Sequence, residues 1–174
     1  MQIQIDSREH KKEVERVKKQ FDELGIDYFT SKLYVGDYMS LDNPRLVIDR
    51  KKDLLEICGN VCQQHERFRN ELIRAKEHGI KIIVLCENGK GIQSLEDVYF
   101  WENPRGEPTK WIMRDGHPVK IPDKAGAIQG AQLYKSLCTI RDRYGVEFRF
   151  CEKHETGAEI VRLLGGDMDV KGVD

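Results

Sequence analysis

The sequence has no long apolar segment, no signal-like N-terminus and no excess of charge of one sign. No apolar run approaches the roughly 20 residues that span a bilayer, and the first residues lack a signal peptide's charged and apolar regions. We therefore expect an intracellular, cytoplasmic protein without a membrane partner. Its 29 Lys and Arg residues nearly match its 30 Asp and Glu residues, whereas proteins that coat nucleic acid non-specifically are usually strongly basic. That class is disfavoured, but an enzyme with one basic face is not.

The cysteines and glycines form no recognisable cofactor motif. The five cysteines are an odd number and lie mostly in apolar segments, as expected for reduced residues in or near a core. Cys58, Cys62 and His65 have helical spacing, but no second Cys/His pair follows at the spacing of a zinc site, so core packing is the better interpretation. No glycine-rich phosphate-binding loop is present, which argues against an ATP-driven motor.

The sequence does contain an alternation of strand-like and helix-like segments, which predicts one α/β domain over 1–174. Apolar residues at helical spacing indicate helices, and apolar runs or alternations indicate strands. Strands are expected at 2–6, 27–33, 38–41, 46–50, 80–86 and 146–151, with helices at 10–24, about 53–78, about 125–144 and 156–164. The continuous apolar run at 80–86 is typical of a strand that is covered on both faces.

Residues 87–124 interrupt this alternation and are interpreted as an insertion. They contain both tryptophans and most of the prolines, and they predict a hairpin at 111–119 that turns at Asp115 and Gly116. The last residues, 166–174, are expected to form a polar tail.

Basic residues alternate with aromatic ones in this insertion. Such a pattern can bind a nucleic-acid backbone and stack on bases, or it can form a small local core with a solvated rim. The local core is favoured for Phe100 and Trp101, and contact with DNA is the candidate role of Lys110, Trp111 and Arg114.

The most informative residues are two carboxylates and a lysine on neighbouring short strands. Asp37 follows a glycine, and Asp49 comes twelve residues later at the end of an apolar run. Mg²⁺ prefers hard oxygen ligands from one or two carboxylates and can activate a water beside a phosphodiester. Because residues 49 and 51 of a strand share a face, Asp49 and Lys51 should lie side by side, with Arg50 aimed elsewhere and its carbonyl available as a ligand. Lys51 could orient the attacking water or stabilise developing charge.

An acid two residues before a lysine is a weak signal by itself, and the chain has three such triplets, at 9–11, 49–51 and 169–171. The first opens a helix and the last lies in the tail. Only the middle triplet ends an apolar run and has a partner acid before it. The alternative for that triplet is an exposed strand end that is followed by a helix cap at Asp53.

Three ordered motifs carry a family resemblance: Ile5-Asp6-Ser7-Arg8-Glu9, Val35-Gly36-Asp37-Tyr38 and Val47-Ile48-Asp49-Arg50-Lys51. Together they resemble the nuclease domain of XPF-type structure-specific endonucleases, in the PD-(D/E)xK superfamily. The resemblance spans nearly the whole chain outside 87–124. It implies a restriction-endonuclease-like core, with a central mixed β-sheet flanked by helices and a hairpin-containing insertion.

The resemblance implies that Asp37 and Asp49 bind the metal, which is expected to be Mg²⁺ with Mn²⁺ able to substitute, and that Lys51 is catalytic. The side chain of Arg50 would be structural or would face phosphate. Asp49 stands where the family has glutamate, so its shorter side chain should hold the metal closer to the strand.

Further roles are implied for Asp6, Arg8 and Arg67. Asp6 would be an accessory acid near the metal, and its alternative is an ion pair with Arg8. Arg8 and Arg67 would contact phosphate or brace the carboxylates, and the alternative for Arg67 is a solvated helix face. For Asp53, catalysis and helix capping both remain open.

The expected function is metal-dependent hydrolysis of DNA phosphodiester bonds, and the resemblance points to branched or flapped DNA, in repair or recombination. A homodimer or a separate DNA-targeting partner is expected. A non-catalytic DNA-binding or scaffolding subunit with the same fold is the main alternative, although Asp37, Asp49 and Lys51 are all present. A sequence-specific restriction enzyme is a third possibility, with the 87–124 insertion as its recognition element.

Overall fold

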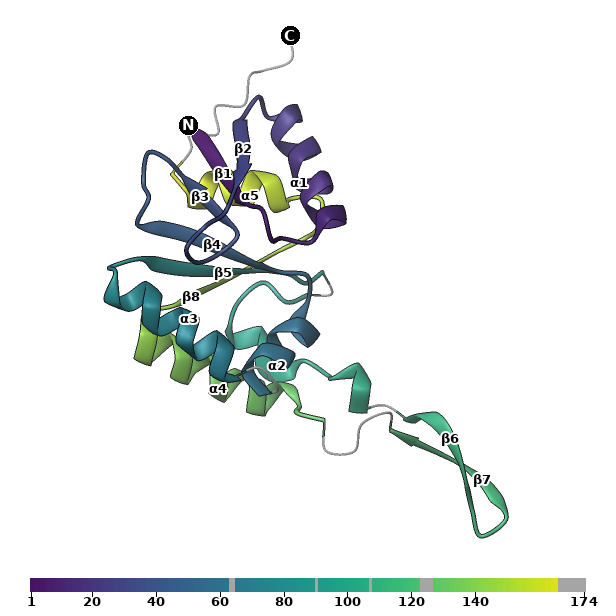
Figure 1. Cartoon of the computed structure of the whole chain (residues 1–174). Coiled ribbons are helices and arrows are strands. Elements are labelled where there is room, and N and C mark those ends of the chain that lie inside the picture. Colours follow the sequence, from purple (N-terminus) through teal and green to yellow (C-terminus); the bar gives the residue numbers. More distant parts are fainter. Residues whose placement is uncertain (63–64, 90, 107, 123–126, 166–174) are drawn as a thin grey trace.

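The computed structural model describes residues 1–62, 65–89, 91–106, 108–122 and 127–165, and a six-stranded mixed sheet forms its centre (Figure 1). The strand order is β2-β1-β3-β4-β5-β8. The first three strands in sequence are β1 (Gln2–Asp6), β2 (Asp27–Ser31) and β3 (Tyr38–Ser40), and the others are β4 (Leu46–Lys51), β5 (Lys81–Glu87) and β8 (Glu147–Cys151). β4, β5 and β8 run parallel, whereas β3 pairs antiparallel with both β1 and β4. The predicted mixed sheet and its hairpin of β3 and β4 are confirmed.

Helices cover both faces of this sheet. α2 (Leu54–Cys62), α3 (His65–Glu77) and α4 (Gly130–Tyr144) pack on one face and form the first core, to which β4 contributes Val47. α1 (Lys11–Glu23) and α5 (Thr156–Leu163) pack on the other face and form the second core, to which β4 contributes Ile48. The apolar alternation of the strands therefore serves two buried faces.

The same alternation places the polar end of β4. Since successive side chains of a strand point to opposite faces, Asp49 and Lys51 continue the row of Val47, and Arg50 continues the row of Ile48. The acid and the lysine thus emerge on the α2–α3–α4 face of the sheet, and the arginine on the α1–α5 face.

The single long helix expected from about 53 to 78 is wrong, because α2 and α3 are separate helices on either side of residues 63–64, which lie outside the described part of the chain. Ile57 of α2 and Phe68 of α3 both belong to the first core. Their separation of eleven residues is close to three full helical turns, so the apolar spacing carried no sign of the break.

The predicted hairpin is confirmed. β6 (Pro108–Arg114) and β7 (His117–Pro122) pair antiparallel through Asp115 and Gly116, and the ribbon projects away from the central sheet (Figure 1). Two 3₁₀ helices precede it, at Glu96–Phe100 and Pro104–Gly106. The expected polar tail at 166–174 and the start of the helix expected at 125 lie outside the described residues.

Burial separates the two aromatic residues that were expected to form a local core. Trp101 packs against the first core, but Phe100 is 80% exposed, so the prediction is wrong for Phe100. None of the described helices is both long and apolar enough to cross a bilayer.

Candidate active site

One pocket of about 330 Å³ collects most of the predicted site residues at the C-terminal end of β4. Its lining includes Asp6, Arg8, Asp37, Asp49, Arg50, Lys51 and Arg67. Asp37, Asp49 and Lys51 therefore face one cavity. Lys110, Trp111 and Arg114 are not among its lining residues, because they lie on the projecting hairpin.

Gly36 brings Asp37 to the sheet. Its φ of +70° is a conformation that residues with a side chain rarely adopt, and an added Cβ would lie 3.0 Å from Val47 Cγ2 and 3.1 Å from the Ile48 carbonyl oxygen. The Asp37 N–H donates to the Ile48 carbonyl at 2.8 Å, and the Asp37 carbonyl accepts the N–H of Asp6 at 2.8 Å. The Gly-Asp pair thus fixes the acid between β1 and β4.

The three central side chains are held by short polar contacts. Asp37 Oδ2 accepts the backbone N–H of Arg50 at 2.7 Å, and Lys51 Nζ lies 2.7 Å from Asp49 Oδ1. Lys51 Nζ also lies 5.9 Å from the centre of the Phe68 ring, over which a cation is favoured. Asp49 and Lys51 are largely buried.

Burial and the nearby charges of this cluster shift the pKa values of Asp37 and Lys51. Burial raises the pKa of Asp37 well above its usual range, and the nearby charges of Asp49 and Glu9 raise it further. Burial alone would lower the pKa of Lys51, but Asp49 and Asp37 raise it above its ordinary value, so the lysine is protonated at neutral pH.

The donor set fits Mg²⁺. Among the described residues, no group of three or more His, Cys, Asp or Glu side chains is arranged to hold a metal ion. Asp37 and Asp49 line one pocket and offer two hard carboxylates, and Mg²⁺ is commonly held by one or two carboxylates, with water and substrate phosphate completing its octahedron. A divalent cation would also relieve the repulsion that raises the pKa of Asp37.

Asp6 is engaged on both oxygens. Oδ1 accepts the backbone N–H of Leu33 at 2.9 Å, and Oδ2 pairs with Arg8 Nε at 2.8 Å, while Arg8 Nη2 donates to the Leu33 carbonyl at 2.8 Å. The ion pair with Arg8 is thus present and ties the end of β1 to the segment after β2. The accessory-acid role of Asp6 stays a prediction.

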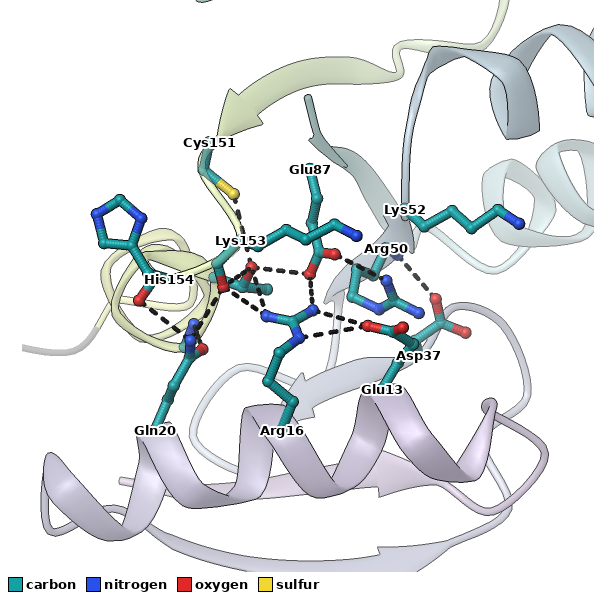
Figure 2. A network of polar contacts seen from close by, with 12 residues as sticks. Glu13, Arg16, Gln20, Asp37, Arg50, Lys52, Glu87, Cys151, Lys153 and His154 are labelled. Carbon is teal, nitrogen blue, oxygen red and sulfur yellow. Dashed lines mark hydrogen bonds and ion pairs between the residues drawn. The ribbon is translucent and has the colours of Figure 1, made fainter. Parts of the chain in front are cut away.

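Arg50 occupies a buried charge network on the other face of the sheet (Figure 2). Its guanidinium pairs with Glu9 at 2.7 Å and with Glu87 at 3.2 Å, and only 4% of its side chain is exposed. Burial would lower its pKa, but the charges of Glu9 and Glu87 raise it above the ordinary value. The side chain therefore has a structural place, and ligation of metal by its carbonyl stays a prediction.

Glu87, at the end of β5, is the centre of this network and is a residue that the sequence analysis missed. Its carboxylate accepts from Arg16 of α1, from Arg50 of β4 and from the hydroxyl of Thr156 at the start of α5 (2.8 Å). In the sequence, Glu87 directly follows the apolar run at 80–86, as Asp49 follows the apolar residues of β4, and this shared pattern could have identified Glu87.

Asp53 is a helix cap. Its Oδ1 accepts the backbone N–H of Glu56 at 2.8 Å in the first turn of α2, as an N-cap side chain does. Asp53 is not among the lining residues of the pocket that contains Asp37 and Asp49. The capping alternative is confirmed.

Exposed arginines surround the acidic centre. Arg8, Arg67 and Arg74 line the pocket and are exposed to solvent. They form a basic rim around the carboxylates. Such a rim would attract a polyanion such as DNA, whose phosphate could then reach a metal ion held by the carboxylates. Their contact with phosphate stays a prediction.

The cysteines are placed as packing residues. Cys86 belongs to the first core, Cys58 packs against it, and His65 is exposed, while the side chain of Cys62 lies outside the described part. Burial raises the pKa of Cys151 to about 12, which opposes formation of a reactive thiolate.

The six-stranded mixed sheet with its acidic pocket places the chain in a known structural class. XPF from Aeropyrum pernix is similar, with a TM-score of 0.59 at 17% identity, over 94% of this chain and 63% of that chain. The structure of XPF from Aeropyrum pernix in complex with DNA gives the same TM-score and identity, over 94% of this chain and 62% of its own. The protein therefore has the α/β fold of the XPF structures, and it spans less than two thirds of their length.

The family assignment follows from the sequence match. The model of the ERCC4 domain matches residues 5–164, and the chain belongs to this family. The resemblance to XPF-type nuclease domains is confirmed. Comparison with the curated proteins finds no match.

Proposed function

We propose that this chain is a Mg²⁺-dependent DNA endonuclease that hydrolyses phosphodiester bonds. The observation that carries the proposal is the convergence of Asp37, Asp49 and Lys51 in one pocket. Membership of the ERCC4 family and the similar fold of an XPF that was solved with DNA support DNA as the substrate. The family resemblance favours branched or flapped DNA over linear duplex.

The residues divide the chemistry among them. Asp37 and Asp49, with the Arg50 carbonyl, would hold Mg²⁺, or Mn²⁺ in its place. The ion would neutralise phosphoryl charge and favour a hydroxide-like nucleophile when bound. Lys51 carries a proton and lies 2.7 Å from Asp49, so it can donate a hydrogen bond to the attacking water or to a phosphoryl oxygen.

The DNA would be held by exposed basic side chains. Arg8 and Arg67 at the rim of the pocket would contact the phosphates beside the cleaved bond. Lys110, Trp111 and Arg114 would contact DNA from the hairpin. A homodimer or a separate DNA-targeting partner would complete substrate selection.

The test compares wild type with Asp49→Ala on labelled linear, flapped and four-way DNA, with Mg²⁺, with Mn²⁺ and with EDTA. We expect cleavage by wild type only when metal is present, and at least a 100-fold slower reaction for the variant. Both proteins should bind DNA. Binding by both proteins without cleavage by either would reject the enzyme and indicate the scaffolding alternative.

Replacement of Asp37 by asparagine tests the cation site without any reaction. Because the pKa of Asp37 is raised in the folded state, its ionised form destabilises the metal-free protein as pH rises above about 4, the ordinary aspartate value. We expect Asp37→Asn to raise the Tm of the metal-free protein at pH 8 more than at pH 4.5. Mg²⁺ at 100 times its Kd should stabilise wild type by about 2.7 kcal/mol and leave the variant unchanged. Equal stabilisation of both proteins by Mg²⁺ would place the cation elsewhere.

A further inference from the structure

The ribbon of β6 and β7 is uncovered on both faces. It projects from the rest of the structure, and none of its described side chains belongs to either core (Figure 1). Trp111 is 65% and Met113 is 69% exposed. A lone two-stranded ribbon is at best marginally stable in water, so a ligand that covers these faces would stabilise it.

Basic side chains stand on both faces of the ribbon. Cross-strand partners share a face, and Trp111 pairs with Lys120, whereas Arg114 on the opposite face pairs with His117. Lys110 shares the face of Arg114 by strand alternation. Lys120 Nζ lies 6.0 Å from the centre of the Trp111 ring, within the range of a cation–π contact.

The charge of the ribbon differs from that of the whole chain. Among residues 108–122, Lys110, Arg114 and Lys120 are basic and only Asp115 is acidic, whereas the chain carries a formal charge of −1. Exposed basic and aromatic side chains without a covering element complement a polyanion with apolar base edges. A DNA duplex offers both.

The ribbon is also preorganised. Asp115 and Gly116 have φ of 50° and 78°, the left-handed pair of a two-residue hairpin turn that matches the twist of the strands. At its base, the buried side chain of Asn103 donates to the Ile128 carbonyl at 2.8 Å, and the Asn103 N–H donates to Gln129 Oε1 at 3.0 Å. The segments on the two sides of the ribbon are thus tied together.

We propose that this ribbon enters the major groove of a duplex arm of the bound DNA, an inference that rests on the proposed function in taking DNA as the ligand. The groove is about 12 Å wide and admits a two-stranded ribbon. Seven residues of β6 at about 3.4 Å each reach about 24 Å, or about seven base pairs. Lys120 on one face and Lys110 with Arg114 on the other reach the phosphates of both groove walls, and Trp111 and Met113 contact sugars and thymine methyl groups.

Methylation protection by dimethyl sulfate tests the inference, because guanine N7 lies in the major groove and adenine N3 in the minor groove. The protein carries Asp49→Ala and is mixed with a flapped DNA in EDTA. We expect protection of guanine N7 over about seven base pairs of one duplex arm. A variant with residues 110–120 replaced by a short Gly-Ser turn should lose this protection while its Tm stays that of the parent.

A charge variant gives a second readout. Lys110→Ala with Arg114→Ala should weaken binding at least 10-fold at 0.1 M salt and reduce the slope of log affinity against log salt by about two. The matched control, Lys19→Ala with Lys135→Ala, removes two exposed lysines from α1 and α4 and should change affinity less than three-fold.

Unchanged guanine protection in the ribbon-less variant, or protection confined to adenine N3, would overturn the inference. So would loss of a dimer in sedimentation without change in DNA binding, because the ribbon would then bind a second copy of this chain. The footprint requires no cleavage, so a failure of the nuclease proposal would be recognised separately.

Discussion

Lys51→Ala is expected to slow DNA cleavage by about 10²- to 10³-fold, the cost of removing one preorganised donor from a site where charge develops. DNA affinity should stay within a few-fold of wild type, because Lys51 is largely buried beside Asp49 and Phe68 and lies below the exposed arginines of the rim. Single-turnover cleavage and filter binding on one labelled flap would separate the two quantities.

The same substitution should not weaken the cation site. Removing the lysine takes away the positive charge 2.7 Å from Asp49 Oδ1, so the pocket becomes more negative and its apparent affinity for Mg²⁺ should stay equal or rise. A magnesium titration of the cleavage rate measures this directly. Loss of metal affinity would mean that Lys51 holds the acids in place.

Lys52 provides the matched control. It is adjacent in sequence and exposed, and it lines a different pocket, with Glu87 and Lys153, instead of the one that contains Asp49. Lys52→Ala should leave turnover within three-fold of wild type. If Lys51→Ala loses DNA binding and turnover together, the lysine docks the substrate and takes no part in the chemistry.

Local patterns were sufficient for part of the site. The alternation of β4 predicted that Asp49 and Lys51 share a face and that Arg50 points away, because the direction of a strand side chain is a property of the strand itself. The hairpin turn at Asp115 and Gly116 was predictable for the same reason.

Contacts between distant segments could not be predicted in this way. Asp6 accepts the backbone N–H of Leu33, 27 residues away, and Glu87 reaches Arg16 and Thr156, about 70 residues away in either direction. No periodicity records which helix will cover a charged strand end. The division between α2 and α3 could not be predicted either, because the apolar residues keep their helical spacing across it.

Glu87→Ala is expected to lower the free energy of unfolding by about 3–5 kcal/mol, the usual cost of leaving a buried charge without its partner. The carboxylate has no solvent-exposed surface, and its loss leaves Arg50 with Glu9 as its remaining ion-pair partner among the described residues. Arg50 Nε is already buried without a hydrogen-bond partner in the described part of the chain, and the substitution would leave a second buried nitrogen of this guanidinium without its acceptor. Urea unfolding monitored by circular dichroism measures the loss.

Two further variants decide what the network contributes. Glu87→Gln keeps the shape and the hydrogen bond from Thr156 but removes the charge, so it should lie between wild type and Glu87→Ala. Glu147→Ala breaks the pairs with Lys81 and Arg149, whose side chains are 54% and 50% exposed, and should cost no more than about 1 kcal/mol. Equal losses for Glu87→Ala and Glu147→Ala would show that burial adds nothing to the strength of the Glu87 network.

A large loss for Glu87→Ala alone, with slower cleavage by the folded protein, would link the network to the site, because the backbone N–H of Arg50 is the group that holds Asp37.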